Sequence, residues 1–252
     1  MADIQRAAFS KRIFAFLADI VIGGLLLTGL YMLMSTVLNI DKYSEKYKAV
    51  RTSYEEQYGV TFGLDRESFE KLTEEEKKVY TAAVDAMNGD EEANKAIRTA
   101  YRLSFGIFAA GIVVTTLLLE FIVPLFTKDG RTPGKLLFGL GVMRKNCLRM
   151  SAPVSFVRGV IGKGVFELAL PAVIIVTVFS NVTGIFGIIM LAVFLILETV
   201  ALVKSGGSSA LHDVLADTVV IDWHSQMIFN TVEEREAFEL ERKKITEEEY
   251  IN

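Results

Sequence analysis

Lys11-Arg-Ile-Phe-Ala-Phe-Leu-Ala-Asp19 is the stretch of sequence that decides the fold. It opens an apolar run from Ile13 to Leu38, yet it carries an arginine at the start of the run and a carboxylate inside it. On an α-helix Arg12 and Asp19 lie on one face, roughly 10 Å apart along the axis. A charge at membrane depth costs about 2.5–3.5 kcal/mol even on the most lenient scale, so it usually faces protein or a water-filled cavity. We therefore expect another part of the chain to cover this face.

The charged and the apolar residues of the chain are segregated. Of its 252 residues 51% are hydrophobic and 23% are charged, and the charges stand in blocks between apolar runs of membrane-spanning length. This pattern predicts a multi-pass membrane protein. The first run is too long for the apolar core of a signal peptide, so we expect it to be retained. Cys147 is the single cysteine, which excludes an intrachain disulfide.

The apolar runs predict an all-α, polytopic integral membrane helical bundle of about four transmembrane helices. The expected spans are Ile13–Leu38, Phe105–Phe126, Val165–Phe179 and Ile185–Val203. The last two are separated because Ser180-Asn-Val-Thr-Gly184 is a natural turn. One long tilted helix is the alternative for this region.

Residues 41–102, which follow the first segment 1–40, form a polar insertion with charges of both signs. Ser44–Tyr58 is expected to be a helix that stops at Gly59, and Thr73-Glu-Glu-Glu76 fits a capping box that opens a second helix. Asn88-Gly89 is expected to end that helix with a left-handed cap, and a third helix should run from Asp90 into the second span. The insertion therefore predicts a solvated helical hairpin outside the cytoplasm, with a dedicated binding domain as the alternative.

The third segment, residues 103–222, holds the remaining spans and the basic loop 127–163, in which Asp129 is the single acid up to Met150. By the positive-inside rule this loop is cytoplasmic, which also places both termini in the cytoplasm. Within it Lys135–Met143 is apolar but too short to span, so we expect an amphipathic interfacial or re-entrant helix with Pro133 near its start. The charged tail, residues 223–252, is expected to be an exposed cytoplasmic helix.

Three separated motifs together resemble the RDD family of membrane proteins, which is named for an arginine and two aspartates. They are Lys11-Arg12 with Asp19; Asp129-Gly-Arg-Thr-Pro-Gly-Lys-Leu-Leu-Phe-Gly-Leu-Gly-Val142 followed by Ser155-Phe-Val-Arg158; and Leu211-His-Asp213 with Thr218-Val-Val220, in the closing segment 211–221. The resemblance implies a bacterial inner or plasma membrane location and a transport role, including proposals of monovalent cation/proton exchange.

Carried over residue by residue, the family's three named residues fall on Arg12, Asp19 and Asp213. The chain departs from the family pattern in its long insertion and at Asp217, where a small residue is more usual. The sequence therefore leaves open which of Asp213 and Asp217 matters.

Several carboxylates lie at or near membrane depth, where a carboxyl can alternate between binding a proton and binding a cation. Asp19, Glu120 and Glu198 are the candidate ion- or proton-coupling residues, and Glu167, near the interface, is the weakest candidate. The alternative for Asp19 is a structural one, in which a cation such as Arg12 or Arg158 neutralises it.

The remaining basic candidates are Arg131, Lys135 and Arg158, which we expect to contact anionic lipid headgroups or to cap a helix. Their Gly130–Lys135 stretch does not have Walker spacing. No other histidine or cysteine stands at ligand spacing from His212, so neither a metal nor another cofactor is expected. No serine, histidine and acid arrangement indicates an enzyme.

Two functions remain open. The first is a secondary transporter that uses Arg12 and the intramembrane carboxylates, with a proton or a small cation as partner. The second is a non-transporting membrane factor that assembles, scaffolds or regulates another complex through its insertion and its cytoplasmic loop. Membrane lipids and either a second copy of the chain or another membrane protein are expected partners. Nucleic acid is not, because the chain has no basic stripe.

Overall fold

The computed structural model describes residues 4–127, 129–179, 183–205 and 209–251. The chain forms two compact units. The bundle unit consists of Met1–Leu26 and Val113–Asn252, and the insertion unit is Leu27–Ile112.

Three helices of the described chain are long and apolar enough to cross a membrane. They are α1 (Phe9–Val37), the continuous helix made of α5 (Glu91–Leu117), η1 (Leu118–Ile122) and α6 (Val123–Phe126), and α10 (Gly184–Lys204). Their large apolar side chains are mostly exposed, for example Phe186 at 74% and Leu25 at 70%. Exposed apolar surface on this scale indicates that lipid covers these helices. The sequence prediction of a membrane protein with apolar helices is confirmed.

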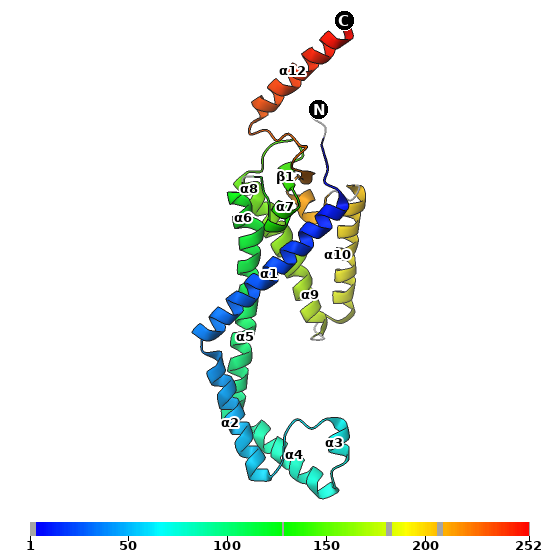
Figure 1. Ribbon diagram of the computed structural model, residues 1–252. Coiled ribbons are helices and arrows are strands. Elements are labelled where there is room, and N and C mark those ends of the chain that lie inside the picture. The colour runs from blue at the N-terminus through cyan, green and yellow to red at the C-terminus, as the bar shows by residue number, and fades with distance from the viewer. Residues whose placement is uncertain (1–3, 128, 180–182, 206–208, 252) are drawn as a thin grey trace. The chain divides into compact units, whose positions relative to one another are not determined.

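A fourth helix runs through the π-helical segment η2 (Val157–Ala169) and α9 (Leu170–Phe179) without a break. It begins well before Val165, and the charges of its first half leave only a short apolar stretch, so it is not among the three candidate spans. Helices α9 and α10 lie side by side in opposite directions (Figure 1). The alternative of one long helix is wrong, because α9 ends at Phe179 and α10 begins at Gly184. Residues 180–182 of the expected turn lie outside the described residues.

A two-stranded antiparallel sheet corrects the all-α prediction. Helix α7 ends at Leu137, and β1 (Leu140–Arg144) pairs with β2 (Thr218–Asp222), with Val142 opposite Val220. The predicted helix Lys135–Met143 is therefore wrong in its second half. Gly139, at φ 65°, turns the chain out of α7 into the strand. A short apolar run buried on both faces gives no periodicity that separates strand from helix, which explains the error.

Both faces of this sheet are buried in small apolar clusters. One cluster is built from Ala7, Ala15, Leu140, Val142 and Val220. The other contains Met143, Cys147, Leu148, Val219, Ile221 and Phe229. The first cluster fixes the start of α1 against the sheet, and short helices lie next to it at one end of the bundle unit (Figure 1). These helices are α7 (Pro133–Leu137), α8 (Ala152–Phe156) and α11 (Leu211–Leu215).

The charged tail forms α12 (Val232–Ile251), as predicted. Its first turns are attached to the rest of the bundle unit, because Phe238 packs on Phe229 and Arg235 donates a hydrogen bond to the carbonyl oxygen of Asn146.

The insertion unit contains α2 (Ile40–Tyr58), α3 (Arg66–Glu70), α4 (Glu74–Gly89) and the first part of α5. The Thr73–Glu76 capping box and the left-handed cap at Gly59, with φ 64°, are confirmed. A left-handed cap at Asn88-Gly89 is wrong. Helix α4 ends at Gly89, and the next residue, Asp90, is extended; its side chain accepts a hydrogen bond from the Ala93 amide in the first turn of α5. Phe62, Ala83 and Met87 form the core of this unit, with tyrosines around it.

Candidate functional site

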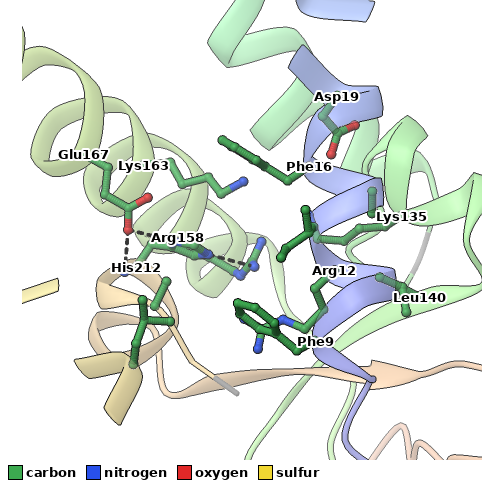
Figure 2. Close-up of a pocket in the computed structure, with 14 residues that line it drawn as sticks. Phe9, Arg12, Phe16, Asp19, Lys135, Leu140, Arg158, Lys163, Glu167 and His212 are labelled. Atoms are coloured by element: carbon green, nitrogen blue, oxygen red, sulfur yellow. Dashed lines mark hydrogen bonds and ion pairs between the residues drawn. The ribbon is translucent and has the colours of Figure 1, made fainter. Parts of the chain in front are cut away.

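The bundle unit contains a half-open cavity of about 340 Å³ next to the sheet, at the end of the unit where α1 begins. Figure 2 shows Lys163, Arg158 and His212 facing Arg12, Phe16 and Lys135 across this space. The charged and titratable lining residues are Arg12, Asp19, Lys135, Arg158, Lys163, Glu167 and His212. The remaining wall is apolar.

Asp19 holds the start of α7. Its Oδ2 accepts a 2.6 Å hydrogen bond from the Thr132 hydroxyl, and its Oδ1 accepts a 2.7 Å hydrogen bond from the Gly134 amide. This approach requires glycine, because a Cβ on Gly134 would lie 2.0 Å from the carbonyl oxygen of Ala15. The predicted cover over the polar face of α1 is therefore the segment that leads into α7. Arg12 is not what Asp19 binds directly. The carboxylate is satisfied by a hydroxyl and a backbone amide.

Arg158 and Asp213 form a buried ion pair, with 2.9 Å between Nε and Oδ1 and side chains 2% and 0% exposed. The Thr218 hydroxyl donates a second hydrogen bond to the same Oδ1. This arrangement joins η2, α11 and the first residue of β2. Burial by itself would raise the pKa of Asp213, but the charge of Arg158 and these hydrogen bonds hold that pKa well below its ordinary range.

His212 connects the ion pair to two glutamates. Its Nδ1 lies 2.6 Å from Glu167 Oε1, and its Nε2 lies 3.1 Å from Arg158 Nη2. Since a guanidinium can only donate, Nε2 must accept and Nδ1 must carry the proton. Burial lowers the pKa of His212, although Asp213 opposes this, and the lowered pKa agrees with a neutral ring. The Glu198 carboxyl contacts that of Glu167, so a hydrogen bond between them requires one of the two to be protonated.

Lys163 and Glu120 form a second interior ion pair, with 2.6 Å between Nζ and Oε1. Glycines in η2 let its neighbours approach closely. A Cβ on Gly159 would lie 2.1 Å from the Glu120 carbonyl oxygen, and one on Gly162 would lie 2.6 Å from His212 Cβ. The π-helical segments η1 and η2 contact each other in this region. Such segments often occur at functional sites.

Lys135 is the buried cation of the cavity that lacks an ion pair. Its Nζ donates to the Thr132 hydroxyl at 3.2 Å, and within the described chain no carboxylate oxygen lies within ion-pairing distance of it. Burial lowers the pKa of Lys135 to about 7; the charge of Lys163 acts in the same direction, and Glu120 opposes it. Arg12 lies within electrostatic range of Asp213 and Arg158.

The charges that line the cavity, or contact those that do, form one group, which we call the charge cluster. Its cations are Arg12, Lys135, Arg158 and Lys163, and its carboxylates are Asp19, Glu120, Glu167, Glu198 and Asp213. With His212 neutral, the described part of the chain therefore places five carboxylates against four cations in this cluster. One positive charge, from a proton or a bound cation, makes the charge cluster neutral.

The RDD family model matches residues 6–217. The chain belongs to the RDD family. No curated protein and no solved structure gave a significant match in the other two comparisons. The matched range contains the whole charge cluster, including Arg12, Asp19 and Asp213, which the motifs in the sequence single out.

The structure distinguishes the two closing aspartates. Asp213 is fully buried in the ion pair with Arg158, whereas Asp217 adopts φ 51° in the turn before β2 and pairs with half-exposed Lys145.

The expected ion-coupling residues occupy different parts of the site. Asp19 faces the cavity, while Glu120 and Glu198 stand behind lining residues. Of the basic residues expected at lipid headgroups, Lys135 and Arg158 are buried and contact other parts of the protein instead. Arg131 stacks on Trp223, 4.3 Å from its ring, and pairs with Asp129.

Sequence reasoning missed three residues of the site. Thr132 and Gly134 hold Asp19, and their signal was the Thr-Pro-Gly-Lys motif at the start of a helix. His212 was considered only as a metal ligand. Within the described residues no group of three or more His, Cys, Asp or Glu is arranged to hold a metal ion.

Proposed function

We propose that this RDD-family membrane protein is a secondary transporter that exchanges protons for a monovalent cation through the cavity. The observation that carries the proposal is the composition of the charge cluster. Among the described residues, five carboxylates and four cations line a cavity next to membrane-spanning helices or contact residues that line it. A desolvated site that is short of one positive charge strongly favours taking up a proton or a monovalent cation. Because the two satisfy the same deficit, they compete, and competition is what an exchanger requires.

Asp19 is the candidate coupling residue that faces the cavity directly. Its charge is held in place by α7, and no described cation pairs with it, so it contributes negative potential to the cavity. The Arg158–Asp213 pair positions η2 and α11 around the same space, and Arg12 lines it from α1. Phe9 and Phe16 narrow it from α1.

The experiment is flux in vesicles. Purified full-length protein is reconstituted in liposomes with an enclosed pH-sensitive dye, and Na⁺, K⁺ or Li⁺ is added outside. We expect cation-dependent proton movement that Asp19→Asn abolishes and Asp19→Glu partly retains. Asp85→Asn changes an exposed carboxylate of α4 in the insertion unit and is the matched control. Absence of flux for all three cations, with protein that is folded by its thermal transition, contradicts the proposal.

For topology we propose four spans, with the helix from Val157 to Phe179 as the third. Support comes from its antiparallel packing on α10 and from the apolar second half of the helix. With four spans, both termini lie in the cytoplasm of a bacterial cell, together with the basic loop and the sheet. The insertion unit then lies outside the cytoplasm. Single-cysteine labelling in a Cys147→Ser background should modify position 80 from outside intact cells and position 223 only after lysis. Labelling of position 80 from the cytoplasm contradicts this topology.

The insertion unit favours a second candidate function, which is assembly or regulation of another membrane complex. It forms a compact unit with its own aromatic core, and it contributes no residue to the cavity. A reproducible crosslink from exposed positions of α3 or α4 to one identified membrane protein would support this function. Normal flux by a variant that lacks residues 60–88 would show that exchange does not need most of this unit.

A further inference from the structure

Exchange through the cavity requires a group that can release a proton. The carboxylates are already occupied within the protein: Asp19 by α7, Asp213 by Arg158, and Glu120 by Lys163. A hydrogen bond between Glu167 and Glu198 requires one shared proton, and this proton supplies the positive charge that the cluster otherwise lacks while every cation is charged. Lys135 differs from all of these, because it is buried and forms no ion pair with any residue that the structure describes.

We infer that Lys135 is the proton-binding group of this exchanger, and that a monovalent cation takes the place of its ammonium charge in the cavity. This inference rests on the proposed function and names the residue through which it works. It assigns proton binding to a lysine of α7 and not to Asp19 or Asp213, the aspartates that the family resemblance points to.

The first support is the position of the amine. Lys135 is 7% exposed and lines the cavity, so its Nζ is removed from bulk water but reaches the space that a cation would occupy. A buried ammonium without a carboxylate pays a desolvation penalty that no close partner offsets. Loss of the proton removes this penalty, and the burial-lowered pKa of about 7 places the change near neutral pH.

The second support is a hydrogen-bonded chain that links Lys135 to Asp19. Lys135 Nζ donates to Thr132 Oγ1, and the Thr132 hydroxyl donates to Asp19 Oδ2. A neutral amine can still donate to Thr132, so the chain persists in both protonation states. Asp19 and Thr132 therefore hold the amine in one place whether or not it is charged.

The charged groups around the amine come from several elements. Asp19 and Arg12 face it from α1, Glu120 from η1, and Arg158 and Lys163 from η2. The two η2 cations disfavour the ammonium, and Asp19 and Glu120 favour it. Because these opposing charges surround it, a small change in the position of η2 relative to α7 changes the proton affinity of Lys135.

The exchange step conserves charge. The ammonium gives its proton to water, the nitrogen keeps its lone pair, and one monovalent cation restores the charge that was lost. The cavity thus carries the same charge with a proton on Lys135 as with a neutral amine and one cation. A cavity that holds the Lys135 proton and a cation together has one extra positive charge, and a cavity that holds neither lacks one. Both of these states are therefore disfavoured.

The test measures alkali cation binding by full-length protein in nanodiscs between pH 6 and 9, through the Na⁺- or K⁺-dependent shift of its thermal transition. For one proton competing with one cation, the apparent Kd falls about tenfold for each pH unit up to the lysine pKa and is constant above it. In Lys135→Arg, whose guanidinium stays charged, cation stabilisation is expected to disappear at every pH. In Lys135→Gln it should be present and independent of pH. Lys11→Arg, at a surface ion pair with Asp222, is the matched control and should behave as wild type.

A second readout does not depend on cation binding. The side-chain Cε resonance of isotope-labelled lysine, assigned to Lys135 by its loss in Lys135→Gln, should titrate near neutral pH. If Lys135 keeps its proton to pH 9 in a protein that does exchange, or if Lys135→Arg responds to cations as wild type does, the inference is overturned and the proposed function stands. If Lys135 titrates near neutrality and no cation binds or moves, the proposed function is overturned.

Discussion

Removing one partner of the Arg158–Asp213 pair should destabilise the protein strongly. Arg158→Met leaves the carboxylate of Asp213 fully buried with only the Thr218 hydroxyl as donor on its Oδ1. Breaking a buried pair in this way costs about 3–5 kcal/mol. At about 2–4 °C per kcal/mol for a chain of this size, the thermal midpoint should fall by about 6–20 °C. The assay is thermal unfolding of the full-length protein in nanodiscs, followed by tryptophan fluorescence of Trp223.

The double variant Arg158→Met/Asp213→Leu tests whether the loss of stability comes from a buried charge left without its partner. It leaves no buried charge, and its residual cost is the unpaired Thr218 hydroxyl, about 1–3 kcal/mol. The double variant should therefore be more stable than either single one, Arg158→Met or Asp213→Leu. If the stability losses of the two single variants add in the double variant, Arg158 and Asp213 do not stabilise the protein as an ion pair.

Asp213, the acidic partner of the same pair, should make the stability of the protein depend on pH. The pKa of Asp213 is lower in the folded protein than the ordinary value of about 3.9 for an unfolded chain. The stabilisation is therefore complete above about pH 4 and is lost as the pH falls further. The difference in stability between wild type and Asp213→Leu should narrow below pH 4, and a constant difference down to pH 2 would contradict the assigned ionisation.

Three further predictions concern other parts of the structure. Gly134→Ala places a methyl group 2.0 Å from the Ala15 carbonyl oxygen, so it should cost about 1–3 kcal/mol in thermal unfolding, whereas Gly24→Ala, with open space around it, should cost nothing. Lys135→Met should be more stable than wild type at pH 6, because it removes a buried ammonium. The advantage should shrink as pH rises from about 7 toward 10.5, where the unfolded lysine also loses its proton, and a pH-independent difference refutes the lowered pKa. Thr73→Ala removes the capping box of α4 and should destabilise the insertion unit by about 1 kcal/mol in hydrogen exchange, with unchanged exchange in β1 as the internal control.

The sequence predicts much of the helical architecture because its signals are local. Long apolar runs, the capping box at Thr73 and the glycine stop at Gly59 each depend on residues close in the chain, and each is confirmed. The sheet depends on pairing between segments that lie far apart. Leu140–Arg144 is an apolar run too short to show a period, and its partner strand begins at Thr218. For that reason the strand was predicted as a helix.

The candidate site shows the same division. Arg12, Asp19 and Asp213 were predicted from motifs, and all three belong to the charge cluster. Which groups they contact could not be read from the sequence, since Asp19 binds α7 and Asp213 binds Arg158 across long separations. The burial of Lys135 is also a property of the fold. In the sequence it was one basic residue of a basic loop.

The measurement that tests the central claim most directly is cation-driven proton movement in liposomes by wild type and Lys135→Arg, reconstituted in parallel at equal protein density. Lys135→Arg keeps the positive charge of the residue, and its guanidinium does not release a proton. We predict cation/proton exchange by wild type and none by Lys135→Arg, with thermal midpoints that agree within a few degrees. Exchange by Lys135→Arg at the wild-type rate would contradict it.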